Sequence, residues 1–307
     1  MTSVTVRVPA KINLQLAVGP LRPDGYHGLV TVFHAIGLFD MVSVAAAEAD
    51  SVAVTGEGAG QVPADGDNLA LRAVRALRAV VAAQAGPGVA VTINKRIPVA
   101  AGLAGGSADA AAALVGCNEL WRAGLPVREL CEIAAGVGSD VAFAVLGGTA
   151  VGRGRGERLT PALMPAARYH WVLAFADGAL STPEVYGTLD RLRAADGRAG
   201  KAAEPELSTE LMAALRAGDL ERLGRSLSND LQAPAISLFP ALRKTLDAGR
   251  ESGALGALVS GSGPTCLFLA RDARHATDLA VALSGAGVCR TVTRASGPVP
   301  GATVIER

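Results

Sequence analysis

A glycine-rich bend joins an apolar run to an alanine-rich run, and it reads Pro98-Val99-Ala100-Ala101-Gly102-Leu103-Ala104-Gly105-Gly106-Ser107-Ala108-Asp109. Residues 89–93 before the bend have the β-branched alternation of a strand, and residues 110–120 after it are mostly good helix formers. The sequence therefore predicts a strand, a glycine loop and a helix from Ser107 onward. Glycine permits positive φ, and the first N–H groups of a helix lack internal partners and lie at the positive end of its dipole. We therefore expect the bend to bind the phosphates of a ligand.

The same bend has a simpler interpretation, a tight turn in which Ser107 only caps the helix. Two known phosphate-binding patterns are absent. Gly106 is followed directly by Ser107 without the lysine of a P-loop, and the glycines lack the G-x-G-x-x-G spacing of dinucleotide-binding folds. A phosphate bound here is therefore held by a third kind of loop, in which the hydroxyl of Ser107 is available to the phosphate or to its metal.

The composition indicates a stable globular protein. The chain has 307 residues, of which 50% are hydrophobic, so it can form two domains or one large one. The formal net charge of +1 provides no general field for nucleic acid or for a membrane surface. We therefore expect no nucleic-acid partner, and an acidic ligand must be bound by local groups.

The cysteines and the N-terminal residues bear on location. No C-x-x-C pair occurs among the four cysteines, so neither a zinc site nor a disulfide scaffold is indicated. Residues 1–4 lack the features of a signal peptide, and Asp140 and several glycines interrupt the apolar residues 133–151. We expect a cytoplasmic protein with no membrane span.

Hydrophobic and polar residues alternate from Val4 to Leu16, which predicts a half-buried strand. Lys11 and Asn13 lie two residues apart, so their side chains project from the same face of this strand, about 7 Å apart along it. Two interpretations remain open. Either both side chains contact one ligand, or both belong to a solvated face of the strand.

A turn places an aromatic ring beside an imidazole in Arg22-Pro23-Asp24-Gly25-Tyr26-His27. Tyr26 and His27 could stack on and hydrogen-bond to a planar base, which has a π-face and a polar edge. Alternatively, the two side chains only cap the end of a hairpin. Another histidine, His34, lies within an apolar run and is interpreted as a core residue.

Ser139 is predicted to cap a short helix over residues 140–146, which places Asp140 in its first turn. The simplest interpretation is that this acidic side chain complements the helix dipole. The alternative is that Asp140 orients and deprotonates a hydroxyl. Phosphoryl transfer tolerates the weak basicity of a dipole-stabilised carboxylate, because its loose transition state depends on alignment more than on basicity.

The remaining chain is predicted to mix helices and short strands. Helices are expected over residues 68–84, 127–135 and 243–252, and strands over residues 171–176, 255–259 and 265–270. Residues 193–206 are expected to form a loop, and residues 260–264 alone indicate a plain hairpin turn. The sequence changes character after Pro161, which places a domain boundary near residue 160.

Three motifs resemble, in order, those of the GHMP family of small-molecule kinases: Pro9-Ala10-Lys11-Ile12-Asn13-Leu14, residues 98–108, and Ser260-Gly261-Ser262-Gly263-Pro264. They span essentially the whole chain, and their combination is far more specific than any one motif. The resemblance implies an α/β (α+β) fold, a two-domain GHMP kinase fold. Residues 1–160 would form a ribosomal-protein-like ATP-binding domain, and residues 161–307 a C-terminal α/β-sandwich domain, with the substrate between them.

Four further segments resemble the branch of this family whose substrate carries a cytidyl diphosphate group: residues 22–27, Val137-Gly138-Ser139-Asp140-Val141, Ser181-Thr182-Pro183 with Tyr186, and Ser228-Asn229-Asp230-Leu231. This resemblance implies transfer of the γ-phosphate of ATP, accompanied by Mg²⁺, to the tertiary 2-hydroxyl of a small cytidyl-diphosphate sugar alcohol in the non-mevalonate isoprenoid route. We expect no nucleic-acid or membrane partner, and a monomer or weak homodimer. The alternatives are a GHMP kinase for homoserine or mevalonate and a nucleotide-binding protein without catalytic activity.

The resemblance also implies roles for individual residues. Lys11 and Asp140 would be the catalytic pair. The ATP phosphates would be bound by Pro98, Val99, Ala100, Ala101, Gly102, Leu103, Ala104, Gly105, Gly106, Ser107 and Ala108. The cytidyl group would be held by Asn13, Tyr26 and His27, and Thr182 and Tyr186 would close over it.

This sequence departs from the family pattern within those sets. Ala100, Ala101 and Ala104 stand where relatives commonly carry glycine, and Tyr186 stands where many carry phenylalanine. Alanine keeps the conformation of such a loop only where φ is negative, so the detailed shape of the loop depends on φ at the three alanines.

Overall fold

The computed structural model describes residues 3–165, 167–197 and 203–307. The first half of the described chain contains, in order, β1 (Ser3–Leu21), β2 (His27–Ala47), β3 (Ser51–Gly56), η1 (Ala59–Gln61), α1 (Leu69–Val80), β4 (Gly88–Lys95), α2 (Gly105–Leu120), α3 (Val127–Val137), α4 (Ser139–Leu146), β5 (Thr149–Gly154) and β6 (Arg158–Pro161). The second half contains β7 (Tyr169–Phe175), α5 (Thr182–Ala195), α6 (Thr209–Ala217), α7 (Leu220–Ser226), β8 (Ser228–Asn229), α8 (Gln232–Leu238), α9 (Ala241–Glu251), β9 (Gly256–Val259), β10 (Cys266–Ala270), α10 (Ala273–Gly285), β11 (Thr291–Gly297) and β12 (Thr303–Glu306).

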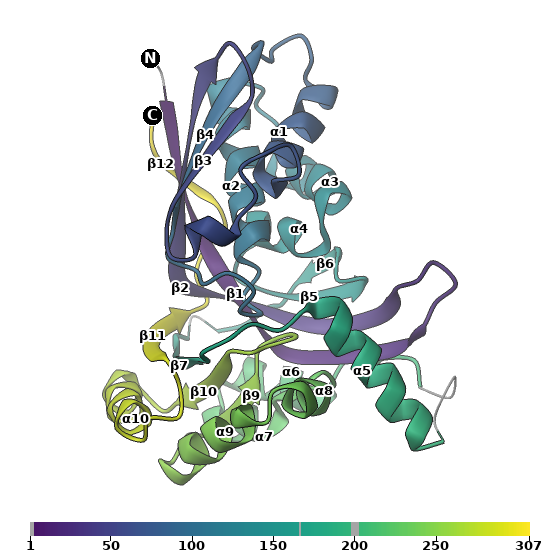
Figure 1. The fold of residues 1–307 in the computed structure, drawn as a ribbon, viewed down its shortest axis with the longest axis vertical. Coiled ribbons are helices and arrows are strands. Elements are labelled where there is room, and N and C mark those ends of the chain that lie inside the picture. The colour runs from purple at the N-terminus through teal and green to yellow at the C-terminus, as the bar shows by residue number, and fades with distance from the viewer. Residues whose placement is uncertain (1–2, 166, 198–202) are drawn as a thin grey trace.

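These strands form two sheets within the described residues (Figure 1). The first follows the order β12-β1-β2-β4-β3, with β5 and β8 attached to it and β6 paired with β5, and the second follows the order β11-β7-β10-β9. The C-terminal strand β12 thus returns to the first sheet. The predicted mixture of helices and strands is confirmed. None of the helices in the described ranges is both long and apolar enough to cross a membrane.

Helix α2 packs closely on the first sheet, which α1 to α4 cover on one face (Figure 1). The small side chains Ala110 to Ala113 are fully buried, which permits the close approach. Gly116 lies inside α2 and does not end the helix. A Cβ at this position would lie 2.9 Å from Cγ2 of Val44 on β2, so packing explains this glycine.

The second sheet is buried on both faces. Leu267 and Leu269 of β10 belong to the large core shared with the first half, whereas Phe268 between them packs with Leu246 of α9 and Leu279 of α10. This strand is therefore continuously apolar, because successive side chains enter two different cores.

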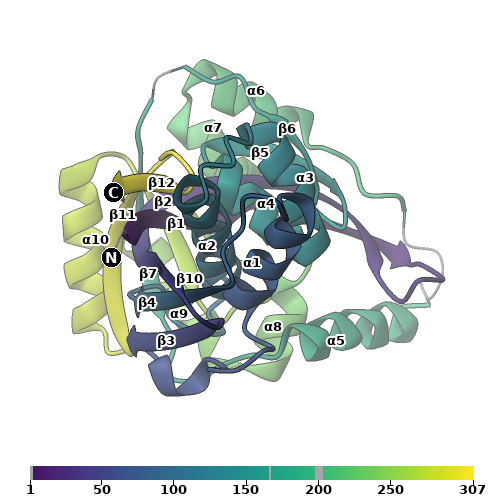
Figure 2. The same cartoon turned by 90° about the horizontal axis from the view of Figure 1, so that it is seen from above.

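Strand β1 is buried more deeply than its alternating sequence predicts. Residues 8–16 are all buried, including Lys11 and Asn13, so the prediction of a half-buried strand with a solvated face is wrong for this part. The polar face is covered from the second half, where Gln15 Nε2 donates to the carbonyl of Glu206 at 2.7 Å. The β1–β2 hairpin then projects from the sheet, and α5 lies along it in both views (Figure 2).

Several predicted element boundaries are wrong by a few residues. Helix α2 begins at Gly105, so Ser107 lies in its first turn and is not the cap, and Ser139 is the first residue of α4 after the cap Gly138. Helix α1 ends at Val80, four residues before the predicted end. The predicted loop over residues 193–206 overlaps the end of α5, and its residues 198–202 lie outside the described residues.

Candidate active site

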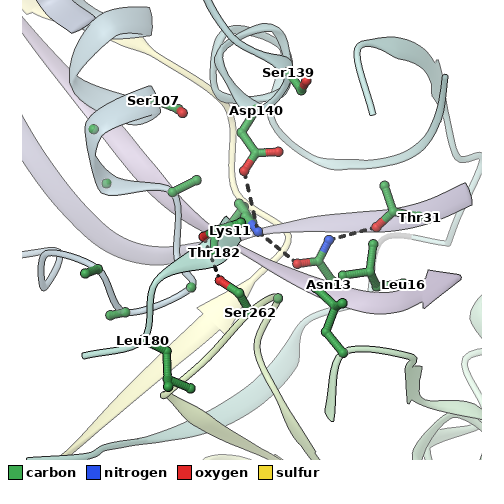
Figure 3. A pocket seen from close by; sticks show the side chains of 18 of the residues that line it. Lys11, Asn13, Leu16, Thr31, Ser107, Ser139, Asp140, Leu180, Thr182 and Ser262 are labelled. Carbon is green, nitrogen blue, oxygen red and sulfur yellow. Dashed lines mark hydrogen bonds and ion pairs between the residues drawn. The ribbon is translucent and has the colours of Figure 1, made fainter. Parts of the chain in front are cut away.

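A cavity of about 590 Å³ lies where both halves meet (Figure 3). Its walls are β1 and β2, the glycine bend, the first residues of α4 and of α5, and the turn after β9. Lys11, Asp140 and Arg155 are the charged residues of this wall. The predicted phosphate loop and the predicted catalytic pair therefore face one space.

Lys11 is held at the centre of this cavity by three groups. Its Nζ donates to Oδ1 of Asn13 at 2.9 Å and lies 3.6 Å from Oδ2 of Asp140 (Figure 3). Its backbone N–H donates to the carbonyl of Leu103 at 3.2 Å, which ties β1 to the glycine bend. The lysine is 9% exposed, so its ammonium is fixed by these partners and largely withdrawn from bulk water.

Asn13 has a defined amide orientation. Its Nδ2 donates to Oγ1 of Thr31 at 2.7 Å, and that hydroxyl donates to the carbonyl of Gln15 at 2.7 Å. Because the Thr31 proton is used, Thr31 can only accept from Asn13, so Asn13 must present its oxygen to Lys11. The sequence analysis did not identify Thr31 as a residue of the site. Its role in orienting Asn13 follows only from the position that Thr31 takes across the β1–β2 hairpin.

Asp140 lies in the first turn of α4, as predicted. The side chain is 31% exposed, so it reaches the cavity while remaining beside Lys11. The start of α4 and the ammonium of Lys11 both place positive charge beside this side chain. The arrangement offers an anionic acceptor for a proton next to a fixed cation.

The glycine bend forms a loop with three left-handed residues, and φ is 51° at Ala100, 75° at Gly102 and 57° at Ala104. The rule that alanine is retained only at negative φ is therefore wrong for Ala100 and Ala104, whereas Ala101 is not among the positive-φ residues. A Cβ at Gly102 would overlap the carbonyl oxygen of Ser260, and Oγ of Ser260 donates to the carbonyl of Gly102 at 3.1 Å. The turn after β9 thus braces the loop and is more than a plain hairpin.

The eleven residues predicted to bind phosphate are divided by the fold. Seven face the main cavity: Ala100, Ala101, Gly102, Ala104, Gly105, Gly106 and Ser107. Leu103 and Ala108 are buried in the core, and Pro98 and Val99 line a separate cavity of about 410 Å³. Of the predicted phosphate-binding residues, these seven are thus the ones that line the main cavity, and three of them, being glycines, offer backbone alone.

A buried cluster of three charges lies beneath the loop and was not predicted. Nζ of Lys95 lies 2.5 Å from Oδ2 of Asp40 and 2.7 Å from Oδ2 of Asp109, and the other oxygen of Asp40 accepts from the backbone N–H groups of Arg96 and Ile97. Burial raises the pKa of Asp109, although Lys95 acts in the opposite direction. The first turns of α2 are thereby anchored to β4 and β2.

The predicted base-binding residues lie at the far end, along the β1–β2 hairpin and α5. The His27 ring is buried, lies 5.2 Å from the ring of Tyr186, and pairs through Nε2 with Oδ1 of Asp190 at 3.0 Å. Tyr26 is 54% exposed. Tyr186 lines the main cavity, and burial, with smaller effects of the Asp140 and Asp230 charges, raises the pKa of its phenol.

Thr182 joins α5 to the turn after β9, because its Oγ1 lies 2.9 Å from Oγ of Ser262 (Figure 3). Asn13, Thr182 and Tyr186 lie together on the wall of the main cavity, which does not include Tyr26 or His27. His27 packs against the ring of Tyr186, and Tyr26 packs against Arg155. Asp190 and Arg155 also lie near this end and had no signal in the sequence beyond their charge.

Two family models match the chain: the one described as GHMP kinases N terminal domain matches residues 68–148, and the one described as GHMP kinases C terminal matches residues 211–289. The 4-diphosphocytidyl-2-C-methyl-D-erythritol kinase of Thermobifida fusca is 54% identical over 312 residues, which cover 99% of each protein. The kinase of the same name from Mycolicibacterium smegmatis is 56% identical over 304 residues, which cover 99% of this chain and 92% of that protein.

Solved structures extend the likeness to the fold. A 4-(cytidine 5'-diphospho)-2C-methyl-D-erythritol kinase superposes with a TM-score of 0.74 at 34% identity, covering 95% of this chain and 98% of that one. A homoserine kinase from Cytophaga hutchinsonii superposes with a TM-score of 0.76 at 20% identity, covering 99% and 98%, which indicates a common fold alone. The predicted two-domain fold class is confirmed.

Proposed function

The chain belongs to the GHMP kinase family, and we propose that it transfers the γ-phosphate of ATP to the 2-hydroxyl of 4-diphosphocytidyl-2-C-methyl-D-erythritol, in the non-mevalonate isoprenoid route. The observation that carries the reaction is the Lys11–Asp140 pair in a cavity that also contains the start of α2. The choice of substrate is supported by the 54% identity to a kinase of that name, against 20% to a homoserine kinase.

The ATP phosphates are proposed to bind at the start of α2. The first backbone bond from this helix to its cap runs from Ala108 N–H to the carbonyl of Ala104, so the N–H groups of residues 105–107 precede the intrahelical ladder. Gly105, Gly106 and Ser107 all face the cavity. Free N–H groups at the positive end of a 16-residue helix suit a phosphate.

Magnesium is proposed to arrive with ATP. No group of three or more His, Cys, Asp or Glu side chains that could hold a metal occurs in the described ranges. Mg²⁺ usually keeps several waters and is held through phosphate oxygens with few protein ligands, and the hydroxyl of Ser107, on the wall of the same cavity, would be one such ligand. The ion would neutralise phosphate charge.

The chain's own residues supply alignment and charge. In the proposed transfer, the substrate oxygen forms a bond to the γ-phosphorus while the bond to the bridging oxygen breaks and its electron pair leaves with ADP. Asp140 orients the 2-hydroxyl and accepts its proton, and Lys11 stabilises the charge on the transferred group. Asn13 keeps the ammonium aimed at this point.

The remaining ligand groups are assigned by position. We propose that the adenosine of ATP enters a cavity of about 270 Å³, which shares four residues with the main cavity: Leu69, Ala100, Gly105 and Gly106. We propose that the cytosine of the substrate binds against Tyr186, at the end of the main cavity where His27 and Tyr26 lie. A domain boundary near residue 160 is supported by the end of β6 at Pro161 before the second sheet starts. We also propose a cytoplasmic location, no nucleic-acid partner, and a monomer or weak dimer.

Turnover by the purified full chain tests the proposed function. ATP and Mg²⁺ are supplied with the cytidyl substrate, with homoserine or with mevalonate, and ADP and the phosphorylated product are both measured. We expect turnover with the cytidyl substrate alone. Turnover with homoserine or mevalonate and none with the cytidyl substrate would overturn the assignment, and nucleotide binding without transfer would indicate a non-catalytic protein.

A further inference from the structure

We infer that Arg155 binds the diphosphate of the substrate and thereby selects cytidine diphosphate compounds over cytidine itself. This inference rests on the proposed function and deepens it. Arg155 lines the main cavity together with Asp140, and its guanidinium carbon lies 4.7 Å from the centre of the Tyr26 ring. The Arg155 side chain therefore belongs both to the cavity wall and to the proposed base-binding end.

The order of groups in the substrate places the diphosphate at this point. A diphosphate separates the cytidine from the sugar alcohol, so a molecule with its base at Tyr26, His27 and Tyr186 and its hydroxyl at Asp140 must carry the diphosphate between these ends. Of the two cations on the cavity wall, Lys11 is already paired with Asp140. Arg155 has no carboxylate of the described residues within ion-pairing distance of its guanidinium.

The β5–β6 turn holds the backbone of Arg155 while leaving its side chain available. Gly154 and Gly156 on either side have φ of 78° and 106°, and the backbone N–H of Arg155 donates to Oε2 of Glu157 at 2.6 Å. A Cβ at Gly156 would lie 3.4 Å from Cζ of Phe33, so the turn packs against the cavity wall. The planar guanidinium can donate two parallel hydrogen bonds to phosphate oxygens, which an ammonium cannot.

Binding of cytidine, CMP and CDP to the full chain tests this role. The matched control is Arg153→Ala, because Arg153 is an exposed arginine near the end of β5, two residues away, that is not part of the cavity wall. Arg155→Ala should weaken CDP binding by about 10- to 100-fold and leave cytidine binding within about twofold. Arg153→Ala should change neither, and Arg155→Lys should restore only part of the loss.

Steady-state kinetics give a second readout. Because the diphosphate is present in both ground state and transition state, Arg155→Ala should raise KM for the cytidyl substrate with little change in kcat and no change in KM for ATP. An equal loss of cytidine and CDP binding would instead assign Arg155 to the base through Tyr26. Unchanged CDP binding, or a rise in KM for ATP alone, would also overturn the inference.

The wild-type measurements separate this inference from the proposed function. If the wild-type chain binds no cytidine nucleotide and does not phosphorylate the cytidyl substrate, the proposed function fails, and the inference fails with it. If the wild-type chain does both and Arg155→Ala behaves as Arg153→Ala does, only the inference fails.

Discussion

The ammonium of Lys11 lies 3.6 Å from the carboxylate of Asp140, although one residue comes from the first strand and the other from the fourth helix. The pair is assembled by the contact of β1 with α4 and by the backbone bond from Lys11 to Leu103. A cation and an acid held together beside a helix start are the groups that the proposed transfer requires.

Asp140→Asn should lower kcat by about 10²- to 10⁴-fold, because the amide keeps the size of the carboxylate but cannot accept the proton. Affinity for ATP should not fall, since Asp140 repels phosphate and does not hold it. Stopped-flow or coupled-assay kinetics with direct ATP titration measure both quantities. Glu132→Gln, an exposed acid on α3, is the control. Unchanged kcat would restrict Asp140 to complementing the helix dipole.

Ala104→Gly should raise the free energy of unfolding by up to about 1 kcal/mol. The left-handed conformation costs an L-residue about 1–2 kcal/mol, and glycine removes this cost. Glycine also increases the entropy of the unfolded chain, which offsets about 0.4–1 kcal/mol of the gain. Ala213→Gly within α6 is the matched control and should lower the same quantity by about 1 kcal/mol. Urea unfolding measures both variants. Equal losses in the two would contradict strain at Ala104.

Lys95→Met should destabilise the protein by about 3–5 kcal/mol, because it leaves Asp40 and Asp109 buried without their cation. The exposed Lys244→Met should change the free energy of unfolding by less than about 0.5 kcal/mol. Asp109→Asn should be tolerated far better than Lys95→Met, since burial already favours the neutral form of Asp109. A Lys95 variant as stable as the Lys244 variant would show that this cluster does not anchor the loop.

His34 should make the protein less stable in acid. Burial lowers its pKa from 6.5 to about 3, so between these values the unfolded chain binds a proton that the folded protein does not. The contribution of neutral His34 to the free energy of unfolding is fully retained above pH 6.5. Below pH 6.5 this contribution falls by about 1.4 kcal/mol for each unit by which the pH decreases. His34→Gln should remove this part of the dependence of the free energy of unfolding on pH. Urea unfolding at several pH values measures this dependence for both proteins. Parallel curves for the two proteins would contradict the expectation.

Local features of the site could be predicted from the sequence, because they depend on neighbouring residues. The bend between β4 and α2 and the place of Asp140 in a first turn follow from glycine content and helix-forming residues within a short window. The joint role of Lys11 and Asp140 came only from the family resemblance, since no spacing within the sequence relates a strand near the start to the fourth helix.

Features made by distant segments could not be predicted. The solvated face expected for β1 is buried because residues from the second half cover it, as the Gln15 contact with Glu206 shows. The Lys95 cluster joins β2, β4 and α2, and no single segment contains a signal for it. The positive φ at Ala104 contradicts the preference of alanine, and such a conformation persists only where the surrounding structure imposes it. The same loop is fixed at Gly102 by the distant Ser260, which no local pattern indicates.

The pairing of β12 with β1 has a consequence for synthesis. Thr5 and Arg7 on β1 pair with Glu306 and Thr303, and farther along the same strand Gln15 pairs with Ser228 of β8, so Lys11 lies between two partners made late. On the ribosome, this edge of β1 stays open until those segments emerge, and an open edge is a site for wrong pairing. The edge of β1 that carries Lys11 is therefore completed only by segments that are synthesised long after Lys11 itself.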